Sequence, residues 1–427
     1  SHEAVIWLGQ HLNGLFGMPG ALDLRTLAIM YALVIGLAIG LTFALIPGNL
    51  AVGLLTTIGI GLVYAESVIA VYFVSPYAEP TVWCGFALLL PALLWYWRAR
   101  RVSWPRLAVV VGLSFMIITA KTQALGYLPA ILLALLWTRR SPIAKSVEKR
   151  SRWKGLASNW RSITACVLLV GASGGYVAAG GNLTVYSQLN VYEMVFTTLL
   201  PAGHDPEGDL RWMGADPALA YANGTTVVSP NGAAGDPRLL KFSRDVTQLT
   251  VLEFIAAHPG RLISLSEDGM QALGHWRPGY LGNYTASSGE PLKQECRSCV
   301  YYYLLTPARA KPFVFGLLLA FAFLTGLWLR NVGFIRSSNR VMGKLVIFLV
   351  TASVSEFWLI LLTQGVGDDV KHQVFTLLPT LLSLPVAASC IALGRRTETV
   401  EFDDEDLGLS DERPVPSPTA MPAPVGS

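Results

Sequence analysis

Ionisable side chains gather at four short places in this sequence, each beside a long apolar stretch. The four places are residues 64–80 with Glu66 and Glu79, residues 120–123 with Lys121 and Gln123, residues 367–373 with Asp368, Asp369, Lys371 and His372, and the pair His2 and Glu3. A positioned carboxylate can remove a proton from a hydroxyl group. A cationic side chain can stabilise negative charge on a departing phosphate. If these places meet in the folded chain, they supply the groups that such chemistry requires.

Each of these groups also has a structural interpretation. Glu79 precedes a proline and fits a loop, and Glu66 can be satisfied by a neighbouring helix. Lys121 can extend its ammonium group to the lipid headgroups. Asp368 and Asp369 can cap the helix that follows them, because acidic residues favour helix N-termini. Their joint position on one face of a membrane is the stronger argument for a functional site.

The composition places these residues in a membrane protein. Of the 427 residues, 52% are hydrophobic and 14% are charged, whereas soluble domains carry roughly 25% charged residues. A helix that spans a bilayer needs about 20 mostly apolar residues. Nine segments approach this length: 24–47, 50–71, 80–97, 105–119, 124–138, 163–180, 312–329, 344–365 and 373–393. The sequence therefore predicts a mainly α-helical, polytopic protein, in which 105–119 and 124–138 form a tight hairpin or a re-entrant pair.

Basic residues orient the predicted spans, because Lys and Arg concentrate in short cytoplasmic loops. Here they cluster at residues 98–106, 139–161, 330–344 and 395–396, and not in a stripe typical of nucleic-acid binding. With nine spans all four clusters fall on one side, so Glu66, Glu79, Lys121 and residues 367–373 lie on the extracytoplasmic face. Residues 1–23 also fall outside, and we therefore expect one further helix upstream of Ser1.

These spans divide the chain into an N-terminal transmembrane region (1–180), an extracytoplasmic domain (181–311), a C-terminal transmembrane region (312–393) and an acidic, Pro-rich cytoplasmic tail (394–427). The tail is expected to be disordered. In the external domain, apolar residues near 246–273 recur at three- and four-residue spacing, which predicts amphipathic helices. Cys296 and Cys299 have no second pair to complete a zinc site. They favour a small structural disulfide in an oxidising compartment over a redox centre.

The order of several short motifs resembles one superfamily. Residues 72–80 read Tyr-Phe-x-Ser-x-Tyr-x-Glu-Pro, and Ala-Lys-x-Gln follows at 120–123. Further motifs occupy 204–210, 216–225 and 276–289, and the Lys371–His372 pair follows two acidic residues. In these motifs the chain resembles C-type (GT-C) glycosyltransferases, and among them the bacterial glycan-biosynthesis hexose transferases. An acidic residue typically stands six positions before the first Tyr of 72–80; here it is Glu66, where Asp is expected. The resemblance covers nearly the whole chain except the tail.

The resemblance implies transfer of a hexose from a polyprenyl-phosphate donor to a glycan or other acceptor outside the bacterial cytoplasmic membrane. It implies that the acidic residues of the catalytic site are Glu66 and Glu79, and that the substrate is bound by Tyr77, Lys121, Gln123, Asp368, Asp369, Lys371 and His372. GT-C enzymes usually carry their catalytic acid in the first external loop, so we expect the general base upstream of Ser1. A divalent cation is compatible with this chemistry, but nothing in the sequence requires one.

Two other functions remain open from the sequence. A transporter or flippase of lipid-linked glycans would favour charged or broken helices near the bilayer midplane, and often internal repeats. In this sequence the polar residues are predicted at helix ends, and no repeat of fixed period is present. A non-catalytic envelope scaffold would use the external domain for binding alone.

Overall fold

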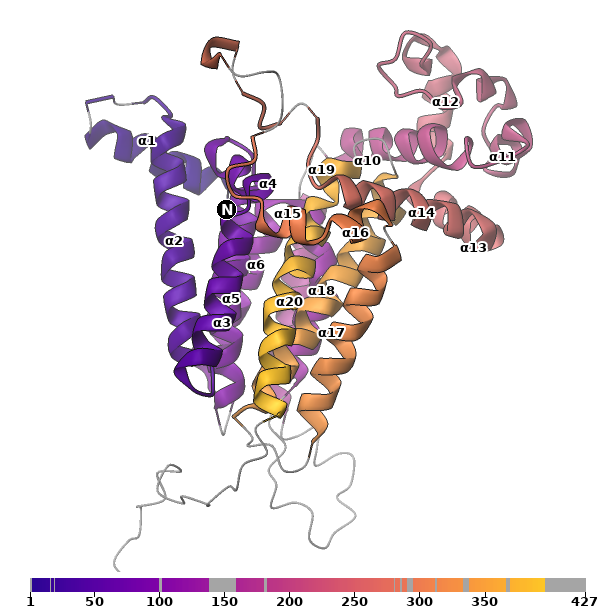
Figure 1. The fold of residues 1–427 in the computed structure, drawn as a ribbon. Helices are drawn as coiled ribbons and strands as arrows, with labels where there is room; N and C mark the ends of the chain where they lie inside the picture. The colour runs from indigo at the N-terminus through magenta and orange to yellow at the C-terminus, as the bar shows by residue number, and fades with distance from the viewer. Residues whose placement is uncertain are drawn as a thin grey trace, which may run out of the picture.

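The computed structural model describes residues 2–15, 17–18, 20–99, 102–137, 159–179, 183–279, 281–284, 286–289, 295–311, 313–332, 338–365 and 369–395. Within these ranges the chain forms helices and no strand. Long helices run side by side in a bundle, and shorter helices gather at one end of it (Figure 1). The chain is therefore a polytopic helical membrane protein, as predicted.

Among the described residues, six helices are long and apolar enough to cross a membrane. They are α2 (Leu24–Leu45), α5 (Glu79–Arg98), α9 (Trp160–Ala179), α17 (Phe313–Asn331), α18 (Arg340–Gln364) and α20 (Val374–Gly394). A seventh span is formed if α3 (Leu50–Ala65) is counted together with α4 (Ser67–Ala70) and η1 (Val71–Val74), which follow it after a bend of 52°.

The predicted count of nine spans is not confirmed, although each predicted segment contains an apolar helix. α6 (Trp104–Ala120) has only 17 residues. At about 1.5 Å per residue it reaches about 26 Å, which is short of a hydrocarbon core of roughly 30 Å. The next segment is divided between η2 (Thr122–Tyr127) and α7 (Leu128–Leu136), and neither part is long enough alone.

Small and hydroxyl-bearing residues join the central helices of the bundle. Ser353 of α18 and Thr380 of α20 approach to 2.5 Å between their hydroxyl oxygens, deep in the interior. A Cβ added to Gly343 of α18 would lie only 2.6 Å from the carbonyl oxygen of Gly326 in α17. Helices in lipid gain little from the hydrophobic effect between them, so close backbone approach and buried hydrogen bonds supply the packing energy.

Arginines mark the helix ends at one end of the bundle. Arg98 ends α5, Arg330 lies in the last turn of α17 and Arg340 begins α18. All three helix ends lie opposite the short helix α19 (Asp369–His372) in Figure 1. We call these the basic end and the α19 end of the bundle. The basic loop 138–158 and the predicted tail from residue 396 onward lie outside the described residues.

A second hydrophobic core lies in the smaller group of helices at the α19 end. It is built by α10 (Leu183–Tyr192), η4 (Glu193–Leu199), α11 (Pro206–Trp212), η5 (Pro217–Ala222), η6 (Ala233–Gly235), α12 (Pro237–Asp245) and α13 (Gln248–Ala257). Asp205, Asp216 and Asp236 begin their helices by accepting a backbone N–H, each at 2.9 Å. The predicted amphipathic stretch 246–273 forms two helices, because Pro259 starts α14 (Pro259–His275) anew. α14 contacts α19 and so joins this group to the bundle.

Candidate functional site

An ion pair at the α19 end joins two of the predicted site residues. Glu79 is the first residue of α5, and Lys121 follows the last residue of α6. Lys121 Nζ donates to Glu79 Oε1 at 2.6 Å. The Glu79 side chain is 1% exposed and the Lys121 side chain 21% exposed. The carboxylate is therefore held inside the bundle, while the ammonium group remains partly accessible.

A glutamine connects this pair to the other end of the sequence. Gln123 Nε2 donates to Gln364 Oε1 at 2.6 Å and lies 2.5 Å from His372 Nδ1. Because an amide nitrogen can only donate, Nδ1 of His372 must accept, which requires a neutral imidazole. Gln364 is the last residue of α18, and His372 the last of α19. The loop between the last two spans thus folds onto the start of η2.

Aromatic rings line the same region. Lys371 Nζ lies 5.1 Å from the centre of the Tyr77 ring, and Lys121 Nζ lies 5.1 Å from the centre of the Phe375 ring. Both distances are typical of cation–π contacts. Burial, together with the charges of Lys121 and Lys371, lowers the pKa of His372 to about 3. Two lysines that are 250 positions apart therefore lie around one imidazole.

The lowered pKa of His372 predicts a loss of stability in mild acid. Below about pH 6.5 the unfolded chain binds a proton at His372 that the folded chain does not, so stability falls as the pH falls towards about 3. Between pH 6.5 and pH 5 this one group costs about 2 kcal/mol. Thermal unfolding in detergent micelles at pH 7 and pH 5 measures the effect. We expect a smaller difference between the two pH values for His372→Gln, and an equal difference for both proteins would contradict the assignment.

Glu356 is a buried acidic residue near Lys121 that the sequence analysis did not name as a candidate. It lies in α18, is completely buried, and neither carboxylate oxygen has a hydrogen-bond partner among the described residues. Lys121 acts on it electrostatically. A Cβ on Gly126 of η2 would come within 2.8 Å of the Glu356 Cα, so only glycine allows this close approach. The signal was present in the sequence, because an acidic residue within a predicted span marks a functional site by default.

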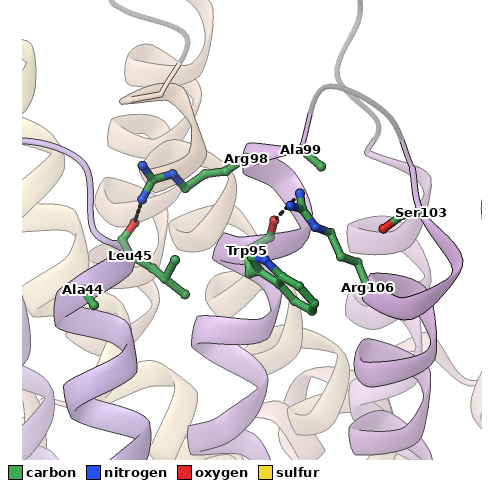
Figure 2. Close-up of a pocket in the computed structure, with 7 residues that line it drawn as sticks. All are labelled: Ala44, Leu45, Trp95, Arg98, Ala99, Ser103 and Arg106. Atoms are coloured by element: carbon green, nitrogen blue, oxygen red, sulfur yellow. Dashed lines mark hydrogen bonds between the residues drawn. The ribbon is translucent and has the colours of Figure 1, made fainter. Parts of the chain in front are cut away.

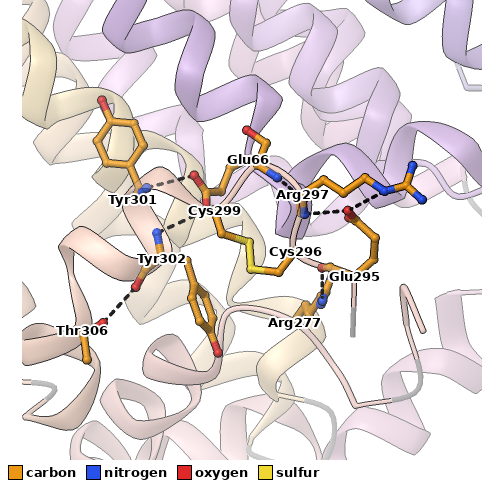
Figure 3. The surroundings of a disulfide bond; sticks show 11 residues. Glu66, Arg277, Glu295, Cys296, Arg297, Cys299, Tyr301, Tyr302 and Thr306 are labelled. Carbon is orange, nitrogen blue, oxygen red and sulfur yellow. Dashed lines mark hydrogen bonds and ion pairs between the residues drawn. A yellow bond between two sulfur atoms is a disulfide. The ribbon is translucent and has the colours of Figure 1, made fainter. Parts of the chain in front are cut away.

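Glu66 lies at the bend after α3 and is engaged by a different segment. Its carboxylate accepts the backbone N–H groups of Tyr301 at 3.0 Å and Tyr302 at 3.2 Å. These residues belong to α15 (Val300–Leu304), which begins directly after the disulfide between Cys296 and Cys299 (Figure 3). Glu66 thus fastens the disulfide loop to the bent span, which is a structural role. Its assignment as a catalytic residue stays a prediction.

The Glu66 contact belongs to a wider set of hydrogen bonds around the disulfide. The backbone N–H of Ser67 donates to the Ser298 carbonyl at 2.6 Å, and the Ser298 N–H donates to the Ser67 hydroxyl at 3.0 Å. Arg277 donates to the Glu295 carbonyl at 2.6 Å (Figure 3). Together these bonds hold residues 295–299 over the end of α3.

The remaining predicted residues are only partly placed. Asp368 lies outside the described residues, and Asp369 begins α19 with a side chain that is also outside them. His2 of α1 (His2–Leu15) contacts the Thr81 hydroxyl and the Pro76 carbonyl, each at 3.0 Å, so it supports the start of α5. Glu3 is exposed. The structure therefore brings together one polar cluster, which consists of Glu79, Lys121, Gln123, Glu356, Gln364, Lys371 and His372 beside the rings of Tyr77 and Phe375.

These features define a multi-pass helical membrane protein with a polar cluster at one end of its bundle. The family described as the YfdI N-terminal transmembrane domain matches residues 1–392, and the chain belongs to this family. No curated protein and no solved structure matches the chain.

Proposed function

We propose that this protein is a GT-C-type glycosyltransferase that moves a hexose from a polyprenyl-phosphate donor to an extracytoplasmic acceptor. The observation that carries the proposal is the meeting of Lys121 and Lys371 around His372 at the α19 end of the bundle. Two cations at the end of membrane helices, next to aromatic rings, suit a lipid phosphate that carries a sugar. The polyprenyl tail of such a donor stays in lipid while its head reaches the cluster.

The contacts suggest a separate role for each of several residues in the cluster. Lys121 and Lys371 stabilise the negative charge that accumulates on the departing polyprenyl phosphate. Glu79 is buried and bonded to Lys121, so it positions that ammonium group. Tyr77, with its exposed ring under Lys371, offers a surface on which a sugar can stack. A carboxylate removes the proton of the acceptor hydroxyl as that hydroxyl attacks the anomeric carbon.

One observation favours a lipid-linked glycan flippase as the second candidate. Glu356 stands eight residues before Gln364, the end of α18, which is about 12 Å along the helix. A buried carboxylate at this depth is typical of transport pathways. The other members of the polar cluster lie at helix ends, and this arrangement supports transfer.

The two functions differ in whether a covalent bond breaks. Membranes that contain the protein are incubated with a polyprenyl-phosphate hexose labelled in the sugar, together with envelope extract as the source of acceptor. A transferase releases unglycosylated polyprenyl phosphate and moves the label into acceptor. A flippase changes the side of the membrane on which the intact donor is found. Donor that stays intact and changes sides would overturn the proposal, and so would donor that neither reacts nor moves.

A further inference from the structure

A cavity at the basic end of the bundle has no part in the proposed transfer. It has a volume of about 670 Å³ and is lined by Ala44, Leu45, Trp95, Arg98, Ala99, Ser103 and Arg106 (Figure 2). These residues come from the end of α2, the end of α5 and the start of α6. The lining contains two arginines and no acidic side chain.

The arginines are fixed in place by helix ends. Arg98 Nη1 donates to the Leu45 carbonyl at 3.0 Å, and Arg106 Nη1 donates to the Trp95 carbonyl at 3.2 Å. The Arg106 guanidinium also lies 4.9 Å from the centre of the Trp95 ring. Figure 2 shows Arg98 reaching to α2 and Arg106 reaching to α5. Arg106 is thus oriented in advance by two contacts, which lowers the entropic cost of binding a ligand. Arg98 is exposed and is directed to α2 by its one hydrogen bond.

Among the described residues, no acidic side chain balances the positive charge of these arginines. A guanidinium has five N–H donors, and each arginine uses one of its terminal nitrogens in the bonds above. Neither forms an ion pair with an acidic residue in the part of the chain that the structure describes. Ser103, which also lines the cavity, directly precedes α6, and helix N-termini favour anions. The chemistry that fits is a phosphate group.

The surface next to the cavity is suited to acyl chains. Ile29, Leu33, Leu37 and Leu41 are exposed on α2. Each lies four residues from the next, so neighbours are adjacent and the row forms a stripe that winds slowly around the helix, and Leu45 of the cavity continues it. At the same end, the exposed rings of Trp104 and Trp160 pack edge to face at 5.5 Å. Tryptophan is enriched at the level of the headgroups. A ligand with a phosphate head and an apolar tail fits both the arginine-lined cavity and the apolar stripe of α2.

We propose that this cavity binds the headgroup phosphate of an anionic phospholipid, with an acyl chain along the exposed stripe of α2. Basic pockets between membrane helices are a known way to hold such headgroups. The site lies at the opposite end of the bundle from the polar cluster, so it is independent of the proposed transfer. A soluble phosphate ion would use the arginines but not the stripe.

Lipid retention by the purified, delipidated protein tests the proposal. The protein is exposed to mixed micelles that contain phosphatidylglycerol or phosphatidylcholine, and bound lipid is counted by native mass spectrometry. We expect preferential retention of phosphatidylglycerol, and a loss of roughly 30-fold in its affinity for Arg98→Gln/Arg106→Gln, on the scale of basic residues near anionic lipid. Arg25→Gln is the matched control, because Arg25 lies at the other end of α2 and is highly exposed. It should bind like the wild type.

A second series of measurements distinguishes loss of charge from loss of folding, and lipid binding from the binding of free phosphate. Arg98→Lys/Arg106→Lys keeps both charges and should retain part of the preference for phosphatidylglycerol. If the glutamine variant elutes as an aggregate, the two single variants replace it. Equal retention of both lipids by the wild type would overturn the proposal. Displacement of phosphatidylglycerol by millimolar inorganic phosphate would also overturn it, because the site would then bind a free anion.

Discussion

Replacing Lys121 by methionine should lower hexose transfer by roughly 10²–10³-fold, by analogy with the loss of one oxyanion-hole donor. The reason is that Lys121 carries the partly accessible ammonium group of the polar cluster, directly beside the buried Glu79. Transfer is measured in membranes with a polyprenyl-phosphate hexose labelled in the sugar. The matched control is Lys241→Met in α12, where the lysine is exposed in the external domain. It removes the same charge and should transfer normally.

A double-mutant cycle with Glu79 distinguishes a positioning role from a catalytic one. If Glu79 acts through Lys121, then Glu79→Gln lowers transfer, and Glu79→Gln/Lys121→Met is no slower than Lys121→Met alone. If Glu79 instead contacts the reacting groups, the two losses multiply. Each variant must reach wild-type levels in the membrane and elute as a single species in detergent. Near-normal transfer by Lys121→Met under these conditions would remove Lys121 from the site and weaken the proposed function.

Lys371→Met should produce a loss of the same size, roughly 10²–10³-fold. Lys371 lies in α19, over the Tyr77 ring, and acts on His372 from a different part of the chain than Lys121 does. Lys371→Arg preserves the cation and should recover part of the activity. The measurement is again the transfer of label from the lipid-linked donor into acceptor.

The double variant Lys121→Met/Lys371→Met tests whether the two lysines serve one phosphate. Neighbouring groups that share a partner are not additive, so the combined loss should be smaller than the product of the single losses. Strictly multiplicative losses would instead assign the lysines to separate steps or separate ligands. His372→Gln is a useful comparison. In the wild type the neutral ring of His372 accepts from Gln123 and presents no charge to the donor.

Hydropathy was enough to predict a polytopic helical membrane protein. Charge predicted that the ends of α5 and α17 and the start of α18 lie at one end of the bundle. Each apolar segment formed one or more helices, because backbone N–H and C=O groups in lipid must bond within their own segment. The predicted count of nine spans is not confirmed, because length along the sequence does not reveal a bend such as the one at Glu66 or the division between η2 and α7. The disulfide partners Cys296 and Cys299 are close in sequence, and the structure joins them.

The composition of the polar cluster depended on the fold. Glu79, Lys121, Gln123, Lys371 and His372 were all candidates by residue type, but so was Glu66, and local sequence gave no reason to separate them. In the tertiary structure the Glu66 carboxylate accepts backbone N–H groups of α15, whereas the Glu79 carboxylate pairs with Lys121. It also placed Glu356 within electrostatic reach of Lys121, through a close approach that only Gly126 permits. Residue types and helix ends can be predicted from the amino-acid sequence. The partner of a buried charge is decided by packing between helices that are distant in the sequence.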